Sequence, residues 1–152
     1  MIPARLDSTR LPGKLMMNLN GTPIILHTLS NTIKTNLFDE VYVVTDSKEI
    51  YEFLLNHHKN VLFSKKNHDS GSDRIAEFAK DMEVDIIVNV QGDEPLIDKN
   101  SLNKLIETFK LDDKNKIGLV SLMKVISNNK ELENPNNVKV VTDVNDFALY
   151  FS

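Results

Sequence analysis

The sequence contains no cysteine, which excludes disulfides and thiolate metal sites and is consistent with a reducing cytoplasm. It also lacks an apolar run long enough to cross a membrane, and its start shows no signal peptide. The net charge of -4 argues against general nucleic-acid binding, because such proteins are usually basic. We therefore expect a cytoplasmic protein without nucleic-acid or membrane partners.

The length of 152 residues and a hydrophobic content of 41% are sufficient for one domain with a buried core. No internal repeat is visible, and we expect the polar stretch 128–137 to be a surface excursion. The first strand has almost no length before Pro3, and the chain stops directly after an apolar run ending at Phe151. We therefore expect a single domain over residues 1–152 that is incomplete at both ends.

Short apolar runs alternate with helical patterns along the chain. Helices are expected at residues 23–34, after a capping box of Asp46 and Glu49, at residues 73–82, and after an Asp98 cap. The alternation predicts βαβ units, and hence an α/β fold with a mostly parallel sheet and helices on both faces. The runs typical of strands are 41–44, 61–63, 86–90, 119–125, 138–141 and 148–151.

Ligands of such sheets bind beyond the carboxyl ends of the strands. The segments that follow the predicted strands should therefore share one rim. These segments are 5–14, 45–46, 68–74 and 91–95.

The first of these segments concentrates arginine. The chain has three arginines against fifteen lysines, and Arg5 and Arg10 lie in this loop together with Lys14. Arginine offers a rigid, planar set of donors that suits phosphate oxygens, which predicts a triphosphate-binding loop. The string is not a P-loop, because it lacks the G-x-x-x-x-G-K-[ST] pattern. The alternative is a basic turn that is simply solvated.

The second segment, 68–74, contains Ser70, Gly71 and the third arginine, Arg74. A Ser-Gly-Ser turn that opens a helix offers free backbone donors and hydroxyls for a base or a ribose. The alternative is a plain helix cap formed by Ser72 or Asp73.

The third segment places carboxylates just after a hydrophobic strand. Asp93 is the first candidate ligand for Mg²⁺ and Glu94 the second, because Mg²⁺ takes one or two carboxylates and completes its shell with phosphate and water. The alternative is an Asp-Glu-Pro turn facing solvent.

Taken together, these motifs resemble those of the 3-deoxy-manno-octulosonate cytidylyltransferases. The opening loop is shared with other sugar nucleotidyltransferases, whereas the string 91–95 and the last two apolar runs are more particular to this family. The matching segments are 2–5, 8–14, 43–46, 70–71, 73–74, 88–96, 134–136, 138–141 and 148–152.

The resemblance implies a nucleotide-diphospho-sugar transferase fold, a Rossmann-like three-layer α/β/α arrangement. It implies that CTP and 3-deoxy-manno-octulosonate (Kdo) react to give CMP-Kdo and diphosphate for lipopolysaccharide biosynthesis. It also implies Mg²⁺ as cofactor and a homodimer in the complete enzyme.

The resemblance assigns catalytic roles to Arg10, Lys14 and Asp93, with Asp93 also the metal ligand. Arg5 and Ser8 would lie beside the triphosphate, and Arg74 near the nucleotide or the sugar. The implied substrate-binding residues are Arg5, Ser8, Ser70, Gly71, Arg74 and Gln91.

Relatives in this family start several residues earlier and continue well beyond Ser152, so the chain resembles a nucleotide-binding portion that is truncated at its C-terminus. One alternative is a nucleotide-binding fragment without catalysis. Another is a cytidylyltransferase for a related sugar acid, such as 8-amino-Kdo or a nonulosonic acid. The sequence names no general base.

Overall fold

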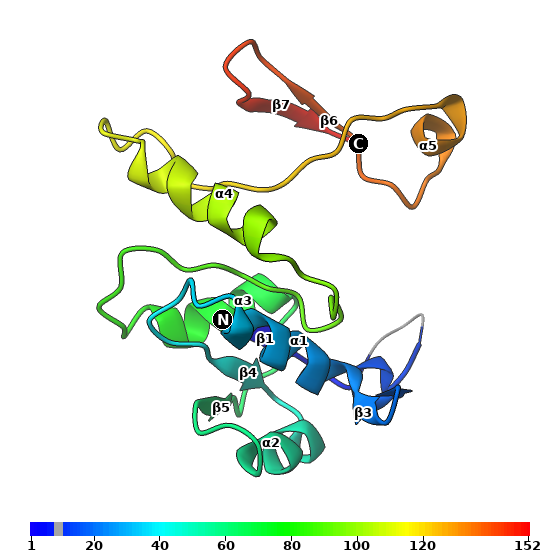
Figure 1. Ribbon diagram of the computed structural model, residues 1–152, viewed down its shortest axis with the longest axis vertical. Helices are drawn as coiled ribbons and strands as arrows, with labels where there is room; N and C mark the ends of the chain where they lie inside the picture. The colour runs from blue at the N-terminus through cyan, green and yellow to red at the C-terminus, as the bar shows by residue number, and fades with distance from the viewer. Residues whose placement is uncertain (8–10) are drawn as a thin grey trace. The chain divides into compact units, whose positions relative to one another are not determined.

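The computed structural model describes residues 1–7 and 11–152, and the chain divides into two compact units, 1–118 and 119–152. Figure 1 traces the chain through both units, and each is described by itself. The expectation of a single domain over residues 1–152 stays a prediction.

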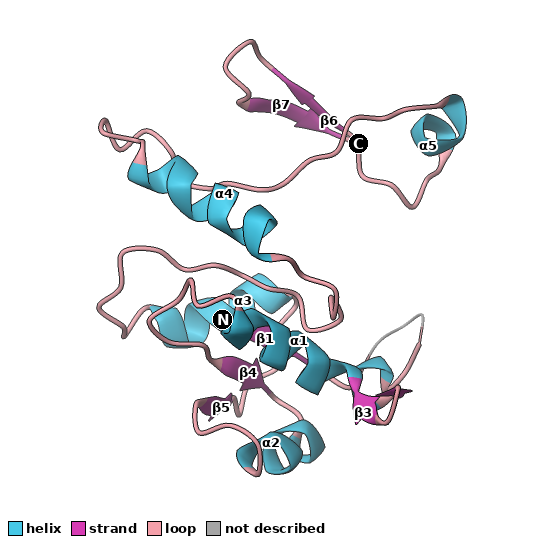
Figure 2. Cartoon of the chain, in the orientation of Figure 1, coloured by secondary structure: helices cyan, strands magenta, loops and turns pink. Residues whose placement is uncertain are grey.

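The first unit contains a parallel sheet in the order β1-β4-β5. Its strands are β1 (Ile2–Ala4), β4 (Val43–Thr45) and β5 (Val61–Phe63). Ile2 pairs with Val43, which in turn pairs with Val61, so the three strands end at the same edge. The predicted α/β fold with parallel strands is confirmed (Figure 2).

Helices pack on this sheet through apolar faces. Ile25 and Leu29 of α1 (Ile24–Lys34) and Ile50 and Leu54 of α2 (Lys48–Leu55) belong to the same buried core as the strands. Leu102 of α4 (Lys99–Lys110) extends this core. The remaining elements of this unit are η1 (Lys14–Met16), β2 (Asn18–Leu19), β3 (Thr22–Pro23) and α3 (Gly71–Ala79).

The predicted cap of α2 was wrong, and so was the cap considered as the alternative for α3. The cap of α2 is Ser47, whose hydroxyl accepts from Ile50 N at 3.3 Å, and not Asp46. The cap of α3 is Ser70, which forms a reciprocal capping box with Asp73, and not Ser72 or Asp73. In both cases the chain leaves the extended conformation at the serine, so its hydroxyl faces the free N–H groups.

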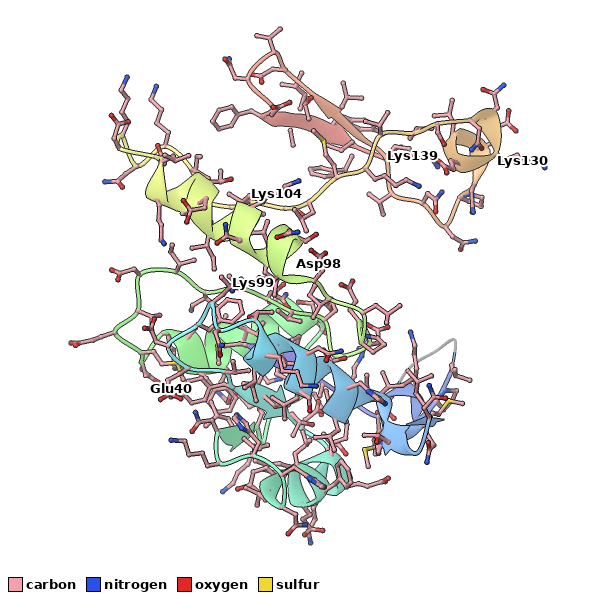
Figure 3. All side chains as sticks on the ribbon, in the orientation of Figure 1. Glu40, Asp98, Lys99, Lys104, Lys130 and Lys139 are labelled. Carbon is pink, nitrogen blue, oxygen red and sulfur yellow. The ribbon has the colours of Figure 1, made fainter. Side chains whose placement is uncertain are left out.

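The cap at Asp98 is confirmed. Its Oδ1 accepts from Ser101 N at 3.0 Å, at the first turn of α4 (Figure 3). Hydrogen bonds from Ser101 lower the pKa of Asp98, and the bond from the Ser101 side chain has a larger effect than the bond from its backbone. A carboxylate at this position is also favourable because the helix dipole is positive at the N-terminus.

The strand predicted at 86–90 is not formed as a regular strand. The segment contacts Met1, directly before β1, through two backbone hydrogen bonds, from the Met1 amino group to Val88 O and from Val90 N to Met1 O, at 2.7 and 3.0 Å. These bonds are too few for a ladder. Val88 and Val90 are nevertheless buried, so the segment is part of the core as expected.

The second unit contains an antiparallel hairpin of β6 (Val140–Thr142) and β7 (Ala148–Phe151) and the short helix α5 (Asn129–Glu133). The predicted strand at 148–151 is confirmed, and the strand predicted at 138–141 begins two residues later. The strand predicted at 119–125 was wrong, since within the described residues this segment forms no strand and no backbone hydrogen bond to a neighbouring segment. The stretch 128–137 is largely exposed, as expected, and includes α5.

Among the described residues, no helix combines the length and the apolar character needed to cross a membrane.

Candidate functional site

A pocket of about 180 Å³ lies in the first unit, beyond the carboxyl end of β1. Three of the four segments predicted to share this rim contribute to it. The described residues that line it are Pro3, Arg5, Lys14, Leu15, Gly71, Arg74, Gln91, Gly92 and Asp93.

Two glycines let these segments approach each other closely. A Cβ on Gly92 would lie 2.9 Å from the carbonyl oxygen of Pro3, and one on Gly71 would lie 3.0 Å from Pro3 Cγ. Both distances are shorter than ordinary contacts, so a side chain at either position would push the loops apart. The string 91–95 and the start of α3 are thus held against the end of β1.

Lys14 and Asp93 form an ion pair across the pocket. Lys14 Nζ lies 2.6 Å from Asp93 Oδ2, and both side chains are partly exposed. Gly13, with φ of 69°, precedes η1 and brings Lys14 into position, and its N–H donates to Leu6 O at 3.0 Å. The left-handed conformation at Gly13 favours glycine.

Arg74 is the one buried arginine among the described residues, with 2% of its side chain exposed. Its guanidinium donates to Asp46 Oδ2, at the end of β4. Its Nε is buried and has no hydrogen-bond partner among the described residues. A guanidinium that is buried, paired on one side and lining a pocket can donate further hydrogen bonds to an anionic ligand.

Gln91 is oriented by a chain of amide contacts. Its Nε2 donates to Asn89 Oδ1 at 2.9 Å, and Asn89 Nδ2 contacts Ser72 Oγ at 3.4 Å. Asn89 was not among our candidates. The signal that could have found it is the single amide inside the apolar run 86–90.

Asp46 was also missed as a site residue, since we interpreted it as a helix cap. Its place at the end of a strand, on the predicted rim, was the available signal. In the structure Asp46 forms an ion pair with Arg74 and so helps to position an arginine that lines the pocket.

The structure brings most of the predicted site residues together. One pocket is lined by six of them, namely Arg5, Lys14, Gly71, Arg74, Gln91 and Asp93. Ser70 is the cap of α3 and directly precedes Gly71 in sequence. Glu94 is not among the described lining residues, and its N–H closes a turn on Gln91 O at 3.1 Å. Ser8 and Arg10 lie outside the described residues.

The described lining residues carry three cationic side chains and one carboxylate, Asp93. The pocket is therefore suited to an anion. Within residues 1–7 and 11–152, no group of three or more His, Cys, Asp or Glu side chains could hold a metal on its own. A metal held by Asp93 would complete its shell with oxygen atoms from a bound anion or from water.

The sequence profile of the cytidylyltransferases matches residues 1–152. The chain belongs to this family. It is 54% identical over 152 residues to a 3-deoxy-manno-octulosonate cytidylyltransferase of Christiangramia forsetii and 51% identical to one of Flavobacterium johnsoniae. These alignments cover all of this chain but 61% and 62% of the two relatives. The resemblance found in the motifs is thereby confirmed.

A search of solved structures agrees with this result. The chain matches a CMP:2-keto-3-deoxy-manno-octonic acid synthetase complexed with CTP, with a TM-score of 0.83 and 32% identity, over 99% of this chain and 61% of that one. It also matches a cytidylyltransferase from Leptospira borgpetersenii, with a TM-score of 0.61 and 30% identity, over 74% of this chain and 48% of that one. The predicted fold class is confirmed, and the chain spans about three fifths of the length of the two curated relatives named above.

Proposed function

We propose that this chain forms the nucleotide-binding part of an enzyme that transfers the cytidylyl group of CTP to Kdo and releases diphosphate. The observation that carries this proposal is the pocket that Arg5, Lys14 and Arg74 line together with Asp93. Three cations around a space of this kind suit a nucleoside triphosphate. The relatives' names and the CTP complex of a similar protein support the choice of nucleotide and acceptor.

The proposed roles of the individual residues are those that the resemblance to the family implies. Lys14 binds the triphosphate, with Arg5 beside it, and Arg10 and Ser8 are proposed to join them. Ser70 and Gly71, at the start of α3, receive the cytosine. The remaining two, Arg74 and Gln91, contact the nucleotide or the sugar acid.

The residues present fit a magnesium ion that arrives with the nucleotide. Asp93 supplies one carboxylate at the pocket, and Mg²⁺ commonly takes one or two carboxylates together with phosphate oxygens and water. When bound, Mg²⁺ neutralises charge on the phosphates and polarises the α-phosphate. Asp93 is accordingly the proposed metal ligand.

The proposed reaction is an in-line displacement at the α-phosphorus of CTP. The anomeric hydroxyl oxygen of Kdo forms the new bond to phosphorus and loses its proton to solvent, and the bond to the bridging oxygen of the departing diphosphate breaks. Such a reaction depends mainly on positioning and on neutralising charge. Lys14 and Arg10 stabilise the charge that develops on the diphosphate. Asp93 is the one carboxylate among the described residues that line the pocket, and because it is assigned to the metal, no side chain there is assigned as general base.

The acceptor and the assembly belong to the same proposal. Kdo is proposed because the relatives carry its name, and a homodimer in the cytoplasm is the proposed working form of the complete enzyme.

The test is a calorimetric titration of the folded chain with Mg·CTP, with UTP and ATP as controls and circular dichroism to verify folding. We expect saturable binding that is selective for CTP. A folded chain with no preference for CTP over UTP and ATP would contradict the proposal. Adding Kdo and assaying diphosphate release then tests the reaction itself.

A nucleotide-binding role without turnover is the second candidate, because the chain spans about three fifths of its relatives' length. It predicts CTP binding with no CMP-Kdo formed at any Kdo concentration. Formation of CMP-Kdo by this chain would exclude it. Competition between Kdo, 8-amino-Kdo and a nonulosonic acid in the same assay separates the acceptor alternatives.

A further inference from the structure

A second polar cluster lies outside the described pocket lining, where the loop between β5 and α3 folds back onto α3. At its centre is the carboxylate of Glu77, which accepts a hydrogen bond from the Ser64 hydroxyl. The same carboxylate lies 3.1 Å from His68 Nε2 and 3.8 Å from Lys66 Nζ. One side chain of α3 thus contacts three positions of the segment 64–68.

Three members of this cluster are shielded from solvent, whereas the side chain of Lys66 is 70% exposed. Ser64 is 2% exposed, and the side chains of His68 and Glu77 are 8% and 18% exposed. A carboxylate in such a place is costly unless it is hydrogen-bonded or paired. The hydrogen bond from Ser64 is the main cause that lowers the pKa of Glu77, with Lys66 and His68 adding to it. Glu77 is therefore satisfied where it lies.

The segment that Glu77 holds leads directly to the pocket. Ser64 N donates to Thr45 O at 2.8 Å, which fixes the start of the segment to the end of β4. Two residues after His68 the chain reaches Ser70, the cap of α3, and then Gly71, which lines the pocket. Arg74 and Glu77 lie three residues apart on α3. Gly71 and Arg74, which line the pocket, therefore lie in sequence between His68 and Glu77, the two side chains that contact each other.

We propose that Glu77 is a positioning residue for the nucleoside side of the pocket. By holding Ser64, Lys66 and His68, it fixes the entry into α3 and so the place of Ser70 and Gly71. The inference rests on the proposed function, which puts the cytosine beside these two residues. Glu77 does not line the pocket itself, and the triphosphate side, at Lys14, does not depend on it.

The experiment compares Glu77→Ala, Glu77→Gln and the wild-type chain in titrations with Mg·CTP and with inorganic tripolyphosphate, which has no base. The matched control is Glu52→Ala, which removes an exposed helix carboxylate that pairs with Lys48 at 3.5 Å, away from the pocket. We expect Glu77→Ala to weaken CTP binding about tenfold, the size of one lost hydrogen bond to a charged group. Tripolyphosphate binding should change by less than about twofold over the same variants.

Glu77→Gln keeps an acceptor for the Ser64 hydroxyl, so it should restore much of the CTP affinity. Hydrogen exchange gives a second readout that needs no ligand: amides of residues 64–71 should exchange faster in Glu77→Ala, while those of α1 stay unchanged.

The possible failures are distinguishable. A wild-type chain that does not prefer CTP overturns the proposed function, and the inference with it. A wild-type chain that prefers CTP, with Glu77→Ala binding CTP like Glu52→Ala, overturns the inference alone. Equal losses for CTP and tripolyphosphate in both Glu77 variants would also overturn it, because they indicate a general structural role.

Discussion

Lys14 Nζ lies 2.6 Å from Asp93 Oδ2, so the lysine proposed to bind phosphate and the carboxylate proposed to bind the metal neutralise each other in this structure. The pair joins two loops that are 79 residues apart in sequence. Both side chains are partly exposed, so the pair adds little to stability. Lys14 and Asp93 can therefore give up this contact for contacts with a ligand at a small cost in free energy. A triphosphate that binds Lys14 would break this ion pair, which would leave the Asp93 carboxylate able to bind a cation.

Replacing Lys14 therefore tests both sides of this exchange. We expect Lys14→Ala to weaken CTP binding by about 1.5–3 kcal/mol, the range for a hydrogen bond to a charged group. It should also raise the affinity of the nucleotide-free chain for Mn²⁺, measured by electron paramagnetic resonance, because Asp93 loses its partner. The control is Lys48→Ala, which removes an exposed lysine that pairs with Glu52. Unchanged CTP affinity in Lys14→Ala would contradict the role of Lys14.

Replacing Asp93 tests the metal site. Asp93→Asn should abolish the Mn²⁺ signal that appears when CTP is added, while binding of CTP without a divalent ion should persist, because Lys14 remains. The control is Asp81→Asn, an exposed aspartate at the end of α3 that is not among the described residues of the pocket. Normal CTP-dependent Mn²⁺ binding in Asp93→Asn would show that the metal is held elsewhere.

Much of the candidate site could be predicted from the sequence, because parallel strands put the loops that follow them on one rim. Lys14, Gly71, Gln91 and Asp93 come from distant parts of the chain, and the pocket unites them as that rule requires. The helices were predictable for a similar reason, since apolar periodicity determines which face is buried.

The local geometry was less predictable. Asp46 follows a strand and precedes a helix, a position that suits a cap, but it pairs with Arg74, which lies 28 residues later. The segment 86–90 has the composition of a buried strand, yet among the described residues its backbone forms two hydrogen bonds with Met1 and no regular ladder with β1. Both outcomes depend on tertiary partners, which residue patterns do not contain.

The close approach at Gly92 predicts a large effect of a single methyl group. Gly92→Ala would place a Cβ 2.9 Å from Pro3 O and 3.2 Å from Ile25 Cδ1. Because the first contact is with backbone, the loops must move, and we expect a loss of about 1–3 kcal/mol in the free energy of unfolding. Gly118→Ala is the matched control, since its Cβ would meet nothing within 4 Å. Urea denaturation of both variants measures the difference, and equal stability would argue against the tight contact.

The cap at Asp98 predicts a dependence of stability on pH. The folded state lowers the pKa of Asp98 from its ordinary value of 3.8. The ionised carboxylate therefore stabilises the folded chain above that value, and this contribution is lost as the pH falls through the lower folded pKa. Asp98→Asn keeps a capping oxygen but cannot titrate. Its stability, measured by chemical denaturation between pH 5 and about pH 2.5, should fall less steeply than that of the wild-type chain, and parallel curves would contradict the assignment.

The pair of Arg74 and Asp46 predicts an effect that a double variant can resolve. Asp46→Ala leaves a guanidinium that is 2% exposed without its carboxylate, so we expect a loss of about 2–4 kcal/mol in the free energy of unfolding. Arg74→Met removes the charge and keeps much of the volume, so the double variant Asp46→Ala/Arg74→Met should be more stable than Asp46→Ala alone. Thermal and urea unfolding of all four chains complete the cycle. If the second substitution makes the chain less stable still, the cost of Asp46→Ala comes from lost packing, and Asp46 has no particular part in holding the arginine of the pocket.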